Sequence, residues 1–238
     1  MEDLLSGKIA VVTGGTRGIG RAIAQSLLGG GALVAVCSRS RENVQAFVNE
    51  CQPADRLRLL AEPADVSKLA DVSKFFQQVD ARFGGVDILI NNAGIGIFKS
   101  VADLTPEEWH RTIDLNLNGV FYCSHEALPR MRRRGGGYIV NISSLAGKNP
   151  FAGGAAYNAS KFGLNGFSEA LMLDHRYDNV RVSYVMPGSV DTDFGSGPAH
   201  SDWKIQPEDI ADVVMALLRL PERTLVSRVE IRPSRPKK

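Results

Sequence analysis

Short apolar runs rich in β-branched residues alternate along this chain with longer segments whose apolar residues recur every three or four positions. The short runs predict strands at residues 9–12, 33–36, 57–61, 86–90, 138–142, 180–185 and 226–231. The longer segments predict helices at residues 18–28, 41–51 and 68–83, from 105 towards 134, ending at about 177, and from 207 onwards. Continuous apolar strands between amphipathic helices are typical of a parallel sheet covered on both faces.

Two of the predicted helices have further support in the sequence: one has a clear N-terminal cap, and the other has an apolar stripe along one face. Thr105 is the expected N-cap, Pro106 stands at the first helical position, and Glu108 closes a capping box. The helix from Pro207 has apolar residues at the i, i+3, i+4, i+7 and i+8 spacing: Ile210, Val213, Val214, Leu217 and Leu218. No linker interrupts the alternation, so we expect residues 1–238 to form one doubly wound α/β domain of the Rossmann type, with a frayed tail at 233–238.

Composition and charge exclude several function classes. The 238 residues are 44% hydrophobic and 23% charged, which fits a single domain of the larger α/β kind. A net charge of only +2 gives no general attraction to nucleic acid, and no apolar run approaches the ~20 residues of a membrane span. The four histidines show no metal-ligand spacing. We therefore expect no nucleic-acid partner, no membrane and no bound metal.

The cysteines and the amino terminus bear on the compartment. The three cysteines are scattered and form no CxxC pair, which is typical of buried or idle thiols in a reducing compartment. The first residues lack the shape of a signal peptide and lead straight into the first predicted strand. A cytoplasmic protein is the expectation.

Tyr157 and Lys161 are the most informative pair of polar residues. Four positions apart on a helix, they lie on one face, one turn from each other. An ammonium group at this spacing favours the phenolate, and a tyrosine with its ordinary pKa of about 10 is a poor base at neutral pH. The same spacing also occurs on ordinary helix surfaces, so the meaning of the pair depends on its surroundings.

A glycine-rich loop, Thr13-Gly-Gly-Thr-Arg-Gly-Ile-Gly20, joins the first strand to the first helix. Gly14, Gly18 and Gly20 would permit a tight turn and a close approach of a pyrophosphate to the helix N-terminus. The spacing is G-x-x-x-G-x-G instead of the usual G-x-G-x-x-G. A plain strand-to-helix turn is the alternative, but the position directly after the first strand favours a dinucleotide.

The end of the second strand bears on the choice of dinucleotide. An NAD site usually places Asp or Glu there, whereas this chain has Cys37-Ser38-Arg39. Arg39, together with Arg17 from the glycine loop, could hold a 2′-phosphate by charge-assisted hydrogen bonds. Unless both are solvated surface arginines, they favour NADP(H) over NAD(H).

Taken together, these features and three further motifs give the chain a family resemblance over nearly its whole length. The motifs are Asp65-Val66 after the third strand, Asn91-Asn-Ala-Gly94 after the fourth, and Pro187-Gly188 with Thr192 after the sixth. The chain resembles the short-chain dehydrogenase/reductase family, in particular its bacterial NADP-dependent carbonyl and β-ketoacyl reductases. The resemblance implies a seven-stranded parallel sheet of order 3-2-1-4-5-6-7 with helices on both faces.

The resemblance also implies the site residues. The catalytic tetrad would be Asn116, Ser144, Tyr157 and Lys161; Ser144 is preferred to Ser143 because it stands thirteen residues before the tyrosine. The cofactor contacts would be Gly14, Thr16, Arg17, Gly18, Ile19, Gly20, Ser38, Arg39, Asp65, Val66, Asn91, Ala93, Gly94, Tyr157, Lys161, Pro187, Gly188, Val190 and Thr192.

The implied reaction is the reduction of a carbonyl group by hydride from NADPH, or its reverse. Tyr157 would exchange a proton with the carbonyl oxygen, and Ser144 would hydrogen-bond that oxygen. Lys161 would lower the pKa of the tyrosine and contact the nicotinamide ribose, while Asn116 would hold a water that links Lys161 to solvent. A non-catalytic NADP-sensing protein on the same fold is the alternative from another class.

Substrate choice should lie in the loop at about residues 193–206, which follows the sixth strand. We expect an open pocket hinged at Gly195 and Gly197, and no charged residue there clearly selects an acid or an amine. A neutral ketone or aldehyde is therefore expected. Packing of Phe194 and Trp203 onto the core is the alternative to the role of pocket wall. The candidate apolar walls are Ile95, Phe98, Ala146, Phe151, Phe194 and Trp203.

Two surface features bear on partners. Arg130, Arg132, Arg133 and Arg134 end the helix that follows Asn116, where cations complement the helix dipole. The alternative is docking of an acidic acyl carrier protein, which would make the protein a β-ketoacyl-carrier reductase. The family pairs the helices of Asn116 and Tyr157 between subunits, so the resemblance implies a homodimer or homotetramer.

Overall fold

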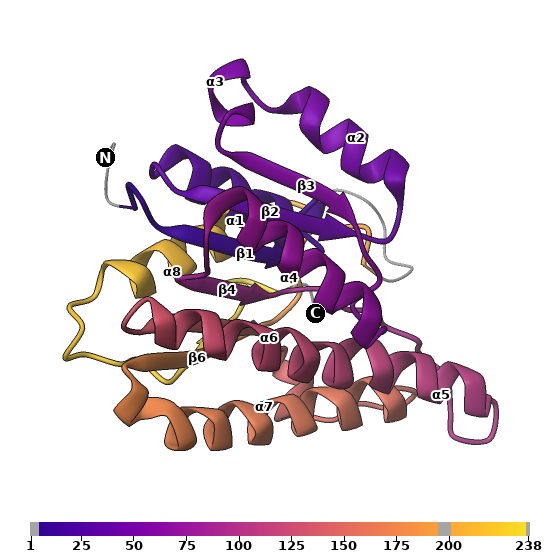
Figure 1. Cartoon of the computed structure of the whole chain (residues 1–238). Helices are drawn as coiled ribbons and strands as arrows, with labels where there is room; N and C mark the ends of the chain where they lie inside the picture. Colours follow the sequence, from indigo (N-terminus) through magenta and orange to yellow (C-terminus); the bar gives the residue numbers. More distant parts are fainter. Residues whose placement is uncertain (1–4, 195–200, 237–238) are drawn as a thin grey trace.

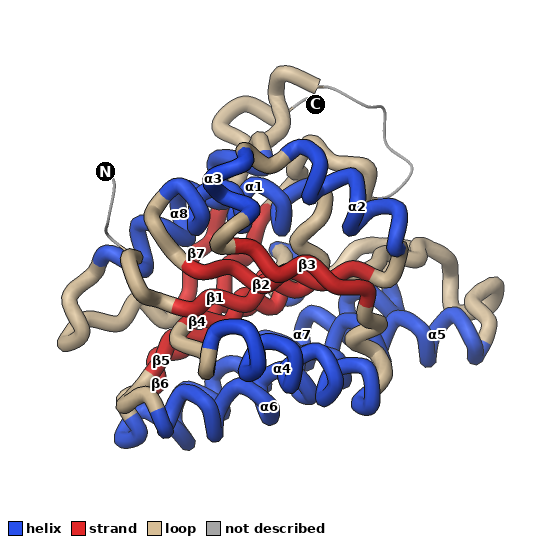
Figure 2. The backbone as a smooth tube through the Cα atoms, turned by 45° about the horizontal axis from the view of Figure 1, so that its top comes forward, coloured by secondary structure: helices blue, strands red, loops and turns tan. Residues whose placement is uncertain are grey.

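Seven parallel strands form one sheet in the order β3-β2-β1-β4-β5-β6-β7, which confirms the predicted order (Figure 2). The computed structural model describes residues 5–194 and 201–236, so the proposed hinges Gly195 and Gly197 lie outside the described residues. The strands are β1 (Ile9–Thr13), β2 (Leu33–Ser38), β3 (Leu59–Pro63), β4 (Ile88–Asn91), β5 (Gly137–Ile142), β6 (Val180–Pro187) and β7 (Arg228–Ile231).

Helices cover both faces of the sheet, with α1, α2 and α8 on one side and α4, α6 and α7 on the other (Figures 1 and 2). In β1, Ala10 and Val12 face the first group while Ile9 and Val11 face the second, because successive side chains of a strand alternate. The helices are α1 (Gly18–Gly29), α2 (Arg41–Glu50), α3 (Pro53–Arg56), α4 (Leu69–Phe83), α5 (Pro106–Ile113), α6 (Gly119–Arg133), α7 (Ala155–His175) and α8 (Pro207–Arg219).

Several element boundaries follow the sequence signals. Thr105 caps α5, and its capping box with Glu108 forms as predicted. The apolar stripe of α8 turns inward, with Ile210, Val214 and Leu217 buried in the core. Of the helices within residues 5–194 and 201–236, none is long and apolar enough to cross a membrane.

Several element bounds differ from prediction; the fourth strand, for example, begins at Ile88 instead of residue 86. The third strand begins at Leu59 instead of residue 57, because Pro53 starts the short helix α3 and leaves Leu57 on the surface. The last strand begins two residues later than expected, at Arg228. The long helix predicted from residue 105 is interrupted by a π-helical turn, Asp114–Asn118, between α5 and α6.

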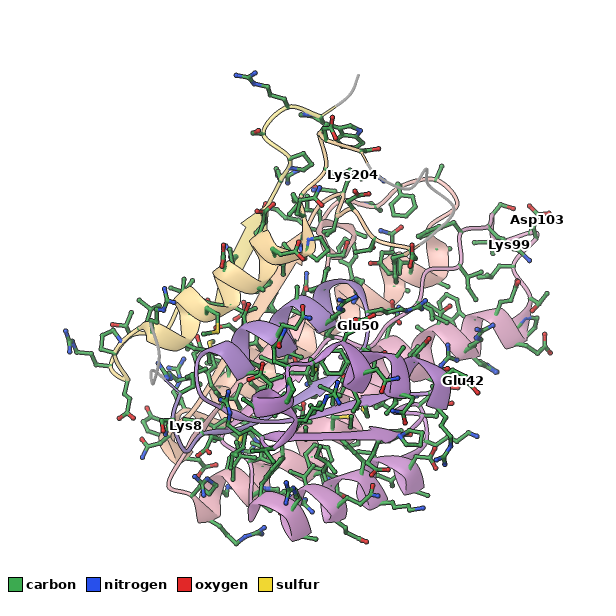
Figure 3. All side chains as sticks on the ribbon, turned by 90° about the horizontal axis from the view of Figure 1, so that it is seen from above. Lys8, Glu42, Glu50, Lys99, Asp103 and Lys204 are labelled. Atoms are coloured by element: carbon green, nitrogen blue, oxygen red, sulfur yellow. The ribbon has the colours of Figure 1, made fainter. Side chains whose placement is uncertain are left out.

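The sheet order fixes where a ligand can bind. Strand β1 lies between β2 and β4, so the chain reverses its direction of winding at this point and leaves a crevice at the carboxyl ends of the strands. Figure 3 shows the two ends of the sheet: Lys8 precedes β1 on one side, while Glu42 and Lys99, which follow β2 and β4, lie on the other.

Candidate active site

A cavity of about 840 Å³ lies at the carboxyl ends of the strands. This volume is within the ~300–1,000 Å³ of small-molecule and cofactor sites. Its walls come from the segments that follow β1 to β6 and from the first turns of α7. It brings together most of the predicted site residues: Gly14, Thr16, Arg17, Gly18, Ile19, Ser38, Arg39, Val66, Ala93, Gly94, Phe98, Ser144, Ala146, Phe151, Tyr157, Lys161, Pro187, Gly188, Val190, Thr192 and Phe194.

The glycine loop packs tightly against the segment after β4. Gly14 has a φ of 62°, and a Cβ on Gly20 would stand 2.3 Å from the Asn92 side chain. The Asn92 amide donates to the carbonyls of Thr13 and Gly14, at 3.0 and 3.1 Å. The loop conformation therefore requires glycine at two of the predicted positions. Asn92 was not predicted as a site residue, although it belongs to the motif quoted after the fourth strand.

The glycine loop also offers unused hydrogen-bonding groups. Arg17, at the N-cap of α1, makes no side-chain capping bond, and the first turn of that helix holds no acidic residue. The Thr16 hydroxyl lines the cavity and is buried without a hydrogen-bond partner among the described residues. Free backbone N–H groups at a helix N-terminus attract anions, so this loop fits a pyrophosphate.

The end of β2 forms the other cationic part of the cavity. Ser38, Arg39, Ser40 and Asn43 line it, and no carboxylate lines it at this position. Arg17 and Arg39 are exposed, and in the part of the chain that the structure describes neither is in an ion pair. These two guanidinium groups are therefore available to an anionic ligand.

Tyr157 and Lys161 lie one turn apart on α7, and both are buried. The Lys161 ammonium lies 5.8 Å from the centroid of the tyrosine ring and donates to the Ile142 carbonyl at 2.9 Å. Burial raises the pKa of Tyr157, although its hydrogen bond with Ser144 opposes that shift. Burial also lowers the pKa of Lys161 to about 8.

These shifts correct one expectation. For the protein groups alone, the pKa of Tyr157 is raised and not lowered, because the loss of hydration outweighs the influence of its neighbours. Ser144 is the neighbour that acts in the predicted direction, through its hydrogen bond to the phenol. Burial instead changes the pKa of Lys161 itself, which falls to about 8 and so lies close to neutral pH.

The structure distinguishes the two serines that follow β5. The Ser143 hydroxyl donates to the Asn165 side chain at 2.5 Å and is buried. The Ser144 hydroxyl accepts from the Ala146 N–H at 3.1 Å, and the Ser144 side chain lowers the pKa of Tyr157. This arrangement favours Ser144 as the residue that meets a carbonyl oxygen.

Asn116 does not line the cavity. It is buried in the π-helical turn, where its amide donates to the Ile95 carbonyl at 2.9 Å and accepts from the Ile95 N–H at 2.8 Å. A third bond joins it to the Ser160 hydroxyl at 3.0 Å. The side chain thus fixes the segment after β4 and joins it to α7, while its role in a water relay stays a prediction.

Five other predicted residues also lie outside the lining of this cavity. Gly20 acts through its tight contact with Asn92, and Ile95 through its backbone bonds with Asn116. The Asn91 amide is buried and donates to Asn141 at 2.9 Å and Ser124 at 3.2 Å, so it joins strands and helix instead of facing a ligand. The Asp65 carboxylate accepts from Ser67 and lines a smaller cavity next to Arg39. Trp203 is partly buried and stays outside the cavity lining.

Three charged residues that sequence reasoning missed line the cavity after β6: Asp191, Asp193 and Lys204. Asp191 and Lys204 lie 3.7 Å apart, and Figure 3 labels the lysine. The position of Asp191, between Pro187-Gly188 and Thr192, could have indicated it, whereas nothing in the sequence marks Lys204. Within the described ranges, no group of three or more potential metal-binding side chains is found.

The arginine cluster after Asn116 is mostly paired within the chain. Arg130 is buried and contacts Asp80 at 2.8 Å and Glu126 at 2.7 Å. Arg132 pairs with Asp178 at 2.7 Å. Arg134 likewise pairs with Asp87 at 2.7 Å. The alternative, in which Arg130 and Arg132 offer a docking surface to an acidic carrier protein, gains no support from these contacts, because acids of the same chain already pair with both arginines.

The comparisons with known proteins agree with this geometry. A sequence model described as short chain dehydrogenase matches residues 8–201. An uncharacterized oxidoreductase of Staphylococcus aureus strain MRSA252 is 33% identical over 97% of this chain and 99% of its own. An alcohol dehydrogenase from the archaeon Thermococcus sibiricus, complexed with 5-hydroxy-NADP, has a TM-score of 0.89 at 32% identity over 97% of this chain and 99% of that one. A metagenomic short-chain oxidoreductase in complex with NADP has a TM-score of 0.84 at 38% identity over 98% and 99%.

Proposed function

This chain belongs to the short-chain dehydrogenase family, and we propose that within it the protein is an NADP(H)-dependent reductase of a neutral ketone or aldehyde. One observation carries the proposal. Tyr157 and Ser144 line the wall of one cavity that continues to Arg17 and Arg39, and Ser144 is the neighbour whose side chain lowers the pKa of the Tyr157 phenol. A substrate carbonyl oxygen that contacts both hydroxyls can take a proton from Tyr157 and accept a hydrogen bond from Ser144.

The preference for NADP(H) has two supports. Arg39 stands at the end of β2, where an NAD site would carry an acid, and Arg17 lines the same cavity from the glycine loop. A guanidinium group binds phosphate by paired, charge-assisted hydrogen bonds. The structurally similar Thermococcus and metagenomic proteins are complexed with 5-hydroxy-NADP and NADP respectively. The pyrophosphate would be held by the glycine loop and Thr16, and the nicotinamide end by the segment from Pro187 to Thr192.

The chain's own residues divide the remaining work. Bound NADPH supplies the hydride. Tyr157 donates the proton to the carbonyl oxygen, and its raised pKa keeps it protonated until that step. Ser144 stabilises the negative charge that develops on the oxygen. Lys161, with a pKa of about 8, can gain or lose a proton near neutral pH and so suits the return of a proton to Tyr157.

A free small molecule is preferred to an acyl-carrier-linked substrate. Docking of an acidic carrier needs exposed cations, and Arg130, Arg132 and Arg134 already contact acids of this chain. A purely sensing role is disfavoured because the cavity holds Ser144, Tyr157 and Lys161 together, which cofactor binding alone does not require.

The test is oxidation of NADPH, and separately of NADH, by the purified protein with a panel of ketones, aldehydes, acyl thioesters and sugars. Turnover of a neutral carbonyl compound with NADPH preferred is the expected result. The double variant Arg17→Ala, Arg39→Ala should raise the KM for NADPH and leave that for NADH nearly unchanged. A preference of the unmodified protein for NADH would contradict the cofactor assignment.

A further inference from the structure

Three phenylalanines from separate loops gather around Tyr157. The ring of Phe98, after β4, lies 5.6 Å from the Tyr157 ring, centroid to centroid, at an interplanar angle of 85°. The ring of Phe194, after β6, lies 5.7 Å from the Tyr157 ring at an interplanar angle of 51°. Phe151, after β5, lies 5.7 Å from Phe98. All three line the same cavity as Ser144.

The three rings leave apolar surface open beside the reacting groups. Their exposed fractions are 44% for Phe98, 46% for Phe151 and 44% for Phe194. Large apolar side chains that remain half exposed as a group, at the wall of a cavity, are typical of a ligand-binding surface. Tyr157 itself is buried beneath them, so a substrate that reaches its hydroxyl must lie against these rings.

Two glycines determine where the rings lie. A Cβ on Gly96 would stand 2.5 Å from the Phe98 ring and 2.9 Å from the Phe194 ring. A Cβ on Gly154 would stand 2.8 Å from the Phe151 ring. The rings therefore occupy space that any other residue at these two positions would fill with its side chain. Replacing a glycine by alanine should displace the rings without removing them.

The cationic groups of the cavity lie away from the three rings. Arg17 and Arg39 are at the end of the cavity that suits a phosphate, and Lys161 is buried on the α7 side of Tyr157. Asp193, next to Phe194, is the acid adjoining the aromatic group and would repel an anionic substrate. The surface beside Tyr157 therefore suits an uncharged, apolar substituent.

We propose that Phe98, Phe151 and Phe194 select an uncharged ketone whose carbonyl carbon carries an aromatic ring. This inference rests on the proposed function. Aromatic pairs arranged edge-to-face or offset gain more than their buried area alone provides. A flat ring beside Tyr157 can make such contacts with these phenylalanines, whereas a straight alkyl chain of equal carbon number makes none. Ring-bearing ketones should therefore be reduced faster than their straight-chain counterparts at equal, subsaturating concentration.

The test compares acetophenone with 2-octanone, which have the same number of carbon atoms, by kcat/KM with NADPH. The wild-type protein should favour acetophenone by about tenfold or more. The variants Phe98→Leu and Phe194→Leu should each lower this ratio by roughly two- to tenfold, which corresponds to the loss of one aromatic pair. Gly96→Ala should lower it similarly, because it displaces both rings while both remain present.

Phe83→Leu is the matched control, since this phenylalanine ends α4 and is absent from the cavity lining. Its ratio should equal that of the wild type. The inference is overturned if the wild type reduces both ketones equally well, or if Gly96→Ala, Phe98→Leu and Phe194→Leu all keep the wild-type ratio. Failure of the proposed function itself would show differently, as an absence of NADPH oxidation with every carbonyl compound tested.

Discussion

At the scale of single residues, burial decides the protonation of the two groups that first indicated an enzyme. Tyr157 holds its proton more firmly than a free tyrosine, and Lys161 holds its proton less firmly than a free lysine. The two shifts move the pKa values of the pair apart, because the tyrosine rises from 10.0 while the lysine falls from 10.5 to about 8. Proton transfer from Lys161 to a Tyr157 that has given up its proton is therefore favourable. The sequence showed the spacing of the pair but could not show its burial.

The buried lysine should make stability depend on pH. Its pKa is about 8 in the folded protein against an ordinary 10.5, so the unfolded chain binds the proton more strongly. The free energy of unfolding should therefore rise with pH between about 8 and 10.5 through this residue. Relative to Lys161→Met, the wild type should gain roughly 2–3 kcal/mol between pH 7 and pH 10. Urea unfolding of both proteins at pH 7 and pH 10 measures these free energies. The prediction is refuted if the difference in stability between the wild type and Lys161→Met is the same at both pH values.

The two serines after β5 should differ in their effect on catalysis. Ser144→Ala removes the hydroxyl that contacts Tyr157, so kcat should fall by ~10²–10³, as for other donors to a developing oxyanion. Ser143→Ala removes a hydroxyl already engaged by Asn165 and should affect stability more than kcat. Steady-state kinetics of both variants measure the two changes in kcat. A larger fall in kcat for Ser143→Ala than for Ser144→Ala would mean that Ser143 is the serine that contacts the carbonyl oxygen.

At the scale of elements, the junction of β1 and α1 depends on close packing around Gly20. Gly20→Ala would place a methyl group 2.3 Å from the Asn92 side chain and the Gly14 carbonyl. We expect NADPH affinity to fall at least about tenfold, because the loop must move away from the position that suits a pyrophosphate. Gly29→Ala, in the same helix with no atom within 4 Å, should bind NADPH normally and be as stable or more so. NADPH fluorescence titration compares them, and equal affinity would refute the role of this contact.

The elements also show what the sequence could and could not predict. The Thr105 capping box and the stripe of α8 follow local rules, whereas the order of strands follows from the family resemblance, and all three are found. The π-helical turn was not predicted because it accompanies bonds from Asn116 to Ile95 and Ser160, which are distant in sequence. Asn91 and Asn92 could not be distinguished either, since only the sheet shows which of two adjacent side chains faces the cavity.

At the scale of the whole molecule, apolar side chains remain exposed along α6 and α7, which lie side by side on one face (Figure 1). Phe121 on α6 is 49% exposed, and on α7 Phe162 is 45% and Leu173 56% exposed. Surfaces of this kind are typical of subunit contacts. We expect a homodimer or homotetramer in solution, formed through this face.

Light scattering at micromolar concentration tests this expectation. Phe121→Asp combined with Phe162→Asp should produce a monomer, because two charges would have to be buried in the contact. Leu57→Asp, at an exposed apolar residue beside β3, should leave the assembly intact. A monomeric wild type would contradict the prediction.

The account as a whole depends on Tyr157 as the proton donor of an NADPH-dependent carbonyl reduction. The most direct measurement compares the wild type with Tyr157→Phe, which removes one hydroxyl from the cavity wall, for both NADPH binding and turnover of the best carbonyl substrate. The variant should bind NADPH with nearly unchanged affinity and lose turnover by ~10²–10⁴. Turnover within a few-fold of the wild type, with NADPH binding intact, would contradict the account.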